Sequence, residues 1–139
     1  MRKRLLMPFI SLAIPACFML LPSLAFAADG VKQCASSRDT AIDYLRCLDR
    51  KMNALESDLT LWGNSHIFAL EAKSKVTGRR DTMHVFKKAQ KSFVKYREHN
   101  CRWQYLSMIP DTSAGAIRYK ECMIDMSQTR VESLKRLSK

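Results

Sequence analysis

The stretch IPDTSAG at residues 109–115 decides the fold of this chain, because it separates two segments of helical spacing that each carry one cysteine. Pro110 disfavours helix at the residue before it, and Asp, Ser and Gly are turn and cap residues. Cys101 and Cys122 each lie eight residues outside positions 109 and 114, roughly 12 Å along a helix at ~1.5 Å per residue. Two antiparallel helices would hold both sulfurs at the same height, which predicts a Cys101–Cys122 disulfide.

The N-terminus has the three parts of a secretory signal peptide. Basic residues follow Met1, an apolar stretch covers residues 5–21, and Ala25-Phe26-Ala27 is an A-x-A cleavage site. We expect cleavage after Ala27 and export of residues 28–139 as one helical domain to the periplasm or the medium. The protein would then meet the membrane only through its signal segment before cleavage. Two alternatives are an uncleaved anchor over residues 5–27 and a lipoprotein site at Cys17.

Removal of the signal peptide leaves 112 residues, which is the size of one domain. Three basic residues leave with it, so 21 Lys and Arg face 13 Asp and Glu, a net charge of +8. The remaining cysteines are even in number and include no CxxC motif, which predicts two structural disulfides among Cys34, Cys47, Cys101 and Cys122.

The first long helix is predicted from a capping box and an apolar seam. Thr40 and Asp43 have the capping-box spacing, and the Gly63-Asn64 pair is expected to end the helix. Its core-facing residues recur at alternating steps of three and four: Ala41, Leu45, Leu48, Met52, Leu55, Leu59 and Trp62. Cys47 falls on the second turn and Cys34 precedes the cap, which favours a Cys34–Cys47 bond; a Cys47–Cys101 bond is the alternative.

The rest of the chain predicts a short helix and then the hairpin. Residues 65–76 form the short helix, residues 77–80 form a turn, and Asp81 or Thr82 is expected to cap the next helix. That helix, at about 82–108, has an apolar side that we expect to face the core: Val85 or Phe86, Ala89, Phe93, Tyr96, Asn100, Trp103 and Leu106 or Ser107. A last helix covers about 114–137. The fold class is all-α, an antiparallel bundle of three to four helices stapled by two disulfides.

The hairpin symmetry also predicts contacts between side chains, because residues level with each other have numbers that sum to about 223. Arg97 is then level with Asp125, which predicts a salt bridge. Phe93 is level with Arg130, which predicts a cation–π contact. We interpret both arginines as structural residues.

A row of cations follows another side of the helix over 82–108. Its residues are spaced at about four positions and few acidic residues interrupt them: Arg79, Arg80, Lys87, Lys88, Lys91, Lys95 and Arg102. Such a row is either a solvated helix face or a strip that binds anions. The sequence leaves both open.

The sequence contains no pattern typical of an active site. GxSxG, HExxH and a phosphate-binding glycine loop are all absent, and the three histidines lack metal-ligand spacing with the cysteines. We therefore expect a protein that is not an enzyme and that needs no metal or cofactor.

Residues 89–101, AQKSFVKYREHNC, resemble the signature A-Q-x-x-W-x-x-Y-R-x-x-x-C of the bacterial LprI-type lysozyme-inhibitor-like family, with Phe93 in place of Trp. The second half of that pattern matches Cys122, Arg130 and Leu134. Its first half matches Cys34, Thr40, Asp43, Cys47, Met52 and Asn53. We expect the matched residues, Gln90, Tyr96 and Arg97 among them, to be structural, whereas residues 63–80 match nothing in the pattern.

The resemblance implies an exported protein that occludes the cleft of a c-type lysozyme, by way of the turn at 110–115 or the segment 63–80. Animal lysozymes are cationic, so a partner at +8 is repelled at long range. The charge alone implies a different partner: anionic lipid, lipopolysaccharide or a cell-wall polymer, but no specific nucleic acid. Another envelope protein is a third candidate partner. Binding to a polyanion should weaken steeply with salt, whereas binding to lysozyme should not.

Overall fold

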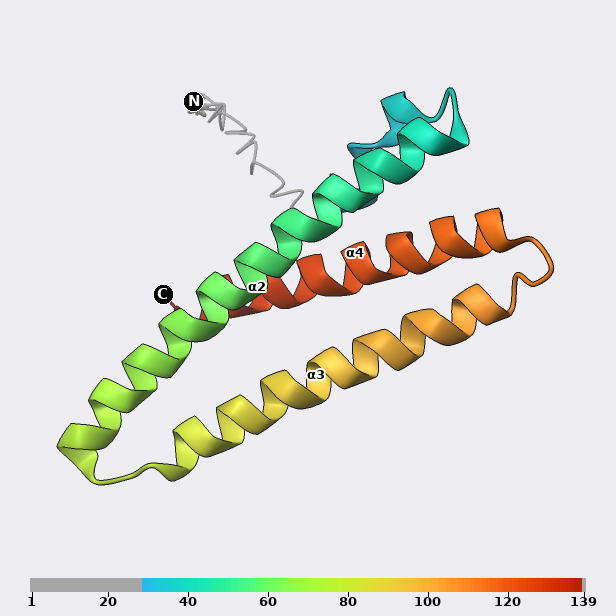
Figure 1. Cartoon of the computed structure of the whole chain (residues 1–139). Coiled ribbons are helices and arrows are strands. Elements are labelled where there is room, and N and C mark those ends of the chain that lie inside the picture. Colours follow the sequence, from blue (N-terminus) through green and yellow to red (C-terminus); the bar gives the residue numbers. More distant parts are fainter. Residues whose placement is uncertain (1–28, 139) are drawn as a thin grey trace, which may run out of the picture.

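The computed structural model describes residues 29–138, which form a bundle of three long helices preceded by two short helical turns. The elements are α1 (Asp29–Lys32), the 3-10 turn η1 (Ala35–Ser37), α2 (Ala41–Thr77), α3 (Asp81–Leu106) and α4 (Thr112–Leu137). The helices α3 and α4 form an antiparallel hairpin, and α2 crosses α4 (Figure 1). The predicted all-α bundle is confirmed. The expected signal peptide, with its cleavage site at Ala25 and Ala27, lies outside the described residues.

Both disulfides join the cysteines that their spacing favoured. Cys34 bonds Cys47, with 5.7 Å between the Cα atoms, and Cys101 bonds Cys122, with 5.5 Å between them. The first bond ties the N-terminal turns to α2, and the second joins α3 to α4. The alternative Cys47–Cys101 bond is thereby excluded.

The helix α2 does not end at Gly63-Asn64, so that part of the prediction is wrong. It continues for 37 residues to Thr77 and absorbs the separate helix expected at 65–76. Gly63 is buried where α2 meets α3, and a Cβ there would lie 3.3 Å from the Gln90 side-chain nitrogen. A glycine inside a helix costs about 1 kcal/mol, and here it gives room for the neighbouring helix.

The two turns between the long helices are short. Gly78 ends α2 with φ of 72°, the left-handed conformation that glycine adopts without strain. Asp81 is the first residue of α3, after Arg80 at the cap position, and no side chain caps this end, so the predicted cap is wrong. At the other turn, the Asp111 carboxylate accepts a hydrogen bond of 2.9 Å from the Ala114 N–H and caps α4.

The helix α4 supplies most of the core. Ile124 and Leu134 are fully buried on it. Ile124 packs with the buried face of α2 around Leu48 and Leu55. A second buried group surrounds the Cys101–Cys122 bond and includes Met123. Because α4 packs against both α2 and α3, while α2 and α3 contact each other much less, α4 is the central helix of the bundle.

We predict that replacing both Cys101 and Cys122 with Ala lowers the free energy of unfolding by about 3 kcal/mol, because the bond closes a loop across a sequence separation of 21 residues. Urea denaturation of the two proteins measures this difference. An unchanged midpoint would mean that the hairpin does not depend on its disulfide.

Gly115→Ala should destabilise the protein by about 2 kcal/mol, although alanine favours helices. Gly115 is buried against Tyr105, and a Cβ there would lie 2.9 Å from the tyrosine ring and 3.1 Å from its backbone oxygen. Ser113→Ala, at an exposed position of the same helix, is the control and should change stability little. A Gly115→Ala protein as stable as the parent would show that α3 and α4 lie further apart at this point.

Candidate functional site

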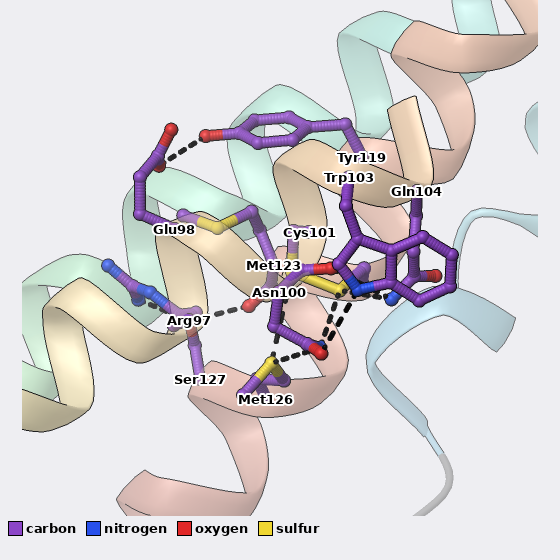
Figure 2. Close-up of a disulfide and its surroundings, with 11 residues drawn as sticks. Arg97, Glu98, Asn100, Cys101, Trp103, Gln104, Tyr119, Met123, Met126 and Ser127 are labelled. Atoms are coloured by element: carbon purple, nitrogen blue, oxygen red, sulfur yellow. Dashed lines mark hydrogen bonds between the residues drawn. A yellow bond between two sulfur atoms is a disulfide. The ribbon is translucent and has the colours of Figure 1, made fainter. Parts of the chain in front are cut away.

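The arginine of the AQKSFVKYR segment lies at the junction of the three long helices. Arg97 projects from α3 and is only 4% exposed. Its guanidinium forms an ion pair of 2.6 Å with Glu56 of α2 and donates a hydrogen bond of 2.5 Å to the Ser127 hydroxyl of α4 (Figure 2 shows the latter). The Ser127 hydroxyl in turn donates to the Met123 carbonyl. This side chain therefore connects all three helices.

The predicted salt bridge between Arg97 and Asp125 is wrong. Asp125 is exposed on α4, and partial desolvation, followed by the nearby Glu121 carboxylate, raises its pKa. Arg97 instead points toward α2. The symmetry of the hairpin says nothing about where α2 packs, so this contact could not be predicted from it.

The predicted contact between Arg130 and Phe93 is confirmed. The Phe93 ring lies 5.7 Å from the guanidinium carbon of Arg130 and 5.7 Å from that of Arg97. Arg130 also donates two hydrogen bonds, of 2.8 and 2.5 Å, to the side-chain oxygen of Gln90. Two cations therefore contact one aromatic ring between α3 and α4, at the position where the family pattern has Trp.

The surroundings of the hairpin disulfide are polar (Figure 2). Asn100 donates to the Met126 sulfur at 3.3 Å, and Gln104 donates to the Cys122 sulfur at 3.3 Å. On the other side, the Tyr119 hydroxyl donates a 2.7 Å hydrogen bond to Glu98. Burial, followed by this bond, raises the pKa of Tyr119 to about 12.

The remaining motif residues lie apart from this junction. Thr40 and Asp43 cap α2: the Thr40 hydroxyl accepts from the Asp43 N–H at 3.0 Å and donates to its carboxylate at 2.7 Å. Leu134 is fully buried, and Asn53 is exposed. Tyr96 is 62% exposed, so its predicted place on the core face of α3 is wrong.

The core face of α3 is more polar than predicted. Trp103, like Tyr96, was expected in the core but is 59% exposed. Of the alternatives Val85 and Phe86, Val85 is 68% exposed and Phe86 is half-buried. The side chains that do face the other helices are partly or fully buried: Phe86, Gln90, Phe93, Arg97, Asn100, Cys101 and Gln104. The sequence predicted Phe93 and Asn100 on this face but missed its polar residues. Gln90, Arg97 and Gln104 recur at seven-residue steps, which is a helical spacing.

The cations of the predicted strip are all exposed, at positions Arg79, Arg80, Lys87, Lys88, Lys91, Lys95 and Arg102. Arg79 forms an ion pair of 2.9 Å with Asp81, and this hydrogen bond lowers the pKa of the Asp81 carboxyl. Among the described residues, the other six form no ion pair.

The surface hollows are open and contain few reactive groups. One, of about 250 Å³, lies between α2 and α3, and its one carboxylate, Glu56, is already paired with Arg97. Within residues 29–138, no three His, Cys, Asp or Glu side chains are grouped as a metal site requires. The helices of this part of the chain are also not apolar enough over a sufficient length to cross a membrane.

The fold defines a class: a small helical bundle stapled by two disulfides. The family model described as "Lysozyme inhibitor LprI" matches residues 32–134. The chain therefore belongs to the LprI lysozyme inhibitor family. No curated protein and no solved structure shows significant similarity to it.

The buried ion pair makes an asymmetric prediction. Glu56→Gln should lower the free energy of unfolding by about 3 kcal/mol, because it leaves the Arg97 charge buried without its partner. Arg97→Met should cost less, about 1 kcal/mol, because the Glu56 side chain that remains is 45% exposed and can be solvated.

Urea denaturation of both variants and of the double variant measures the coupling between the two residues. Asp125→Asn is the control, and we expect it to change stability by less than about 0.5 kcal/mol. A larger loss of stability from Asp125→Asn than from Glu56→Gln would indicate that Arg97 pairs with Asp125, as the hairpin symmetry predicted.

Proposed function

We propose that this chain acts outside the cytoplasm as a binding protein that inhibits a c-type lysozyme, and that it is not an enzyme. The family match over residues 32–134 carries the proposal. The two disulfides support the location, because such bonds persist in oxidising compartments. The proposal includes export through residues 1–27 and removal of that segment.

The turn between α2 and α3 is the part that we expect to enter the lysozyme cleft. It consists of Gly78, Arg79 and Arg80, which are all exposed, and it projects at one end of the bundle (Figure 1). Two long helices and the left-handed Gly78 hold its shape. A preformed short turn loses little conformational freedom on binding, which favours affinity.

Charge also favours this turn. A lysozyme cleft contains two carboxyl groups that flank the scissile bond. The Arg79 charge is engaged by Asp81 at 2.9 Å, whereas Arg80 forms no ion pair with any described residue. We therefore assign the contact with the cleft carboxylates to Arg80.

The turn at 110–115 suits the cleft less well. Its one charged side chain is Asp111, which is occupied as the cap of α4. An acidic group there would be repelled by the cleft carboxylates. Of the two segments that the sequence offered, the part of 63–80 that ends in the α2–α3 turn is the better candidate.

We expect residues 28–139, with both disulfides formed, to slow the clearing of a cell-wall suspension by a c-type lysozyme. The effect should saturate near a one-to-one ratio and persist at physiological salt, because the contact is short-ranged. Turbidity over a concentration series measures it. If an excess of the protein does not slow the clearing, family membership describes the fold of this chain and not its activity.

Arg80→Glu should weaken this inhibition at least about tenfold, because it places like charges next to each other in the complex. Arg50→Glu makes the same change in net charge at an exposed position of α2 and is the matched control. Equal effects of the two variants would show that net charge matters and the turn does not.

A further inference from the structure

The end of the hairpin opposite the α2–α3 turn exposes a group of large apolar side chains. Trp103 is 59% exposed, Leu106 56%, Met108 40% and Ile109 51%. They fall within seven residues, at the end of α3 and in the turn that follows. We call these four residues the apolar hairpin end. The 26 residues of α3 separate it from the α2–α3 turn by roughly 40 Å (Figure 1).

These side chains are not needed to close the hairpin. At this level the space between α3 and α4 is already filled by Tyr105 against Gly115 and by Gln104 against the Cys122 sulfur. The Trp103 indole N–H makes only a long contact of 3.4 Å with the Asn100 side chain of its own helix (Figure 2). An apolar group this concentrated and exposed is typical of a docking site.

Cations lie directly beside the apolar hairpin end. Arg102 lies one turn before Leu106 on the same side of α3, whereas Lys95 lies further away, roughly 16 Å before Leu106 along the helix. On α4, Arg118 lies about as far from the turn as Arg102 does on α3. All three of these cations are exposed. The nearest acid is Asp111, whose carboxylate caps α4 and faces the positive end of that helix.

We propose that the apolar hairpin end docks on a lipid bilayer rich in anionic phospholipid. The side chains of Trp103, Leu106, Met108 and Ile109 enter the interface between headgroups and acyl chains, where Trp is favoured. Arg102 and Arg118, which lie nearest to the inserted side chains, remain at the level of the phosphates. Cations near the surface are attracted to an anionic leaflet, and the attraction increases with their number.

The size and charge of this surface favour a bilayer over a protein. A stable protein interface takes about 800 Å² from each partner, whereas this surface is the narrow end of one hairpin. A second copy of the chain would carry the same positive charge and be repelled. A bilayer requires only a few inserted side chains together with charge attraction.

This docking is independent of lysozyme binding, because it uses the other end of α3. A bundle held by its hairpin end would present the Gly78–Arg80 turn away from the membrane. Loss of one activity therefore leaves the other testable in the same protein.

The experiment is co-sedimentation of residues 28–139 with vesicles of phosphatidylcholine alone or mixed with phosphatidylglycerol. We expect binding to the anionic vesicles only, reduced by added salt. The triple variant Trp103→Ser, Leu106→Ser, Ile109→Ser should lose at least about tenfold in partitioning. The pair Arg102→Glu, Arg118→Glu should lose as much while keeping the apolar side chains.

The matched control replaces three apolar residues of α2 that are more exposed than those of the hairpin end, Leu61, Phe68 and Val76, with Ser and should partition as the parent does. Circular dichroism checks that each variant is folded, and the hairpin variants should still inhibit lysozyme. The proposal is overturned if the parent does not bind anionic vesicles, or if it binds neutral ones equally well. It is also overturned if either hairpin variant binds as the parent does, or if the control loses as much.

Discussion

One buried positive charge determines how the three long helices meet. Arg97 is the only charged residue among those described that is almost inaccessible to solvent. Such a charge without a partner would destabilise the fold by several kcal/mol. The helix arrangement must therefore bring Glu56 of α2 and Ser127 of α4 to the same point on α3. Apolar contacts are non-directional, whereas an ion pair and a hydrogen bond need their partners at fixed distances and angles. We infer that the Arg97 charge helps to specify how the three helices are aligned.

The features that could be predicted from the sequence depend on neighbours in the chain or on a single turn. The Thr40–Asp43 capping box acts within one helical turn, and the two disulfides follow from the distances of the cysteines to their turns. The end of α2 was missed because Gly63 is unfavourable in an isolated helix. In the structure α3 packs beside Gly63, and the Gln90 side chain lies close to it. This proximity explains why a residue without a Cβ suits the position.

The outer face of α3 was misjudged for a related physical reason. Tyr96 and Trp103 were expected in the core because their spacing places them on the same side of the helix as Phe93 and Asn100. Instead, the adjacent face of α3 packs against the other helices. Arg97 and Gln90 lie on this face, and their polar partners on α2 and α4 make their burial favourable. The aromatic side chains are exposed as a consequence. An exposed Trp at the end of a hairpin is then a feature that the core does not explain, and a binding partner can.

The net charge has different consequences at different distances. At physiological salt the charges of two proteins are screened beyond about 8 Å, so the repulsion between a +8 chain and a cationic lysozyme slows their encounter more than it weakens their contact. At contact, the local groups decide: Arg80 against cleft carboxylates at one end of α3, and Arg102 against phosphates at the other. A bilayer is an extended array of charge, so attraction to it adds over all the exposed cations. The same basic composition is thus compatible with both proposals, and each depends on a different end of the same helix.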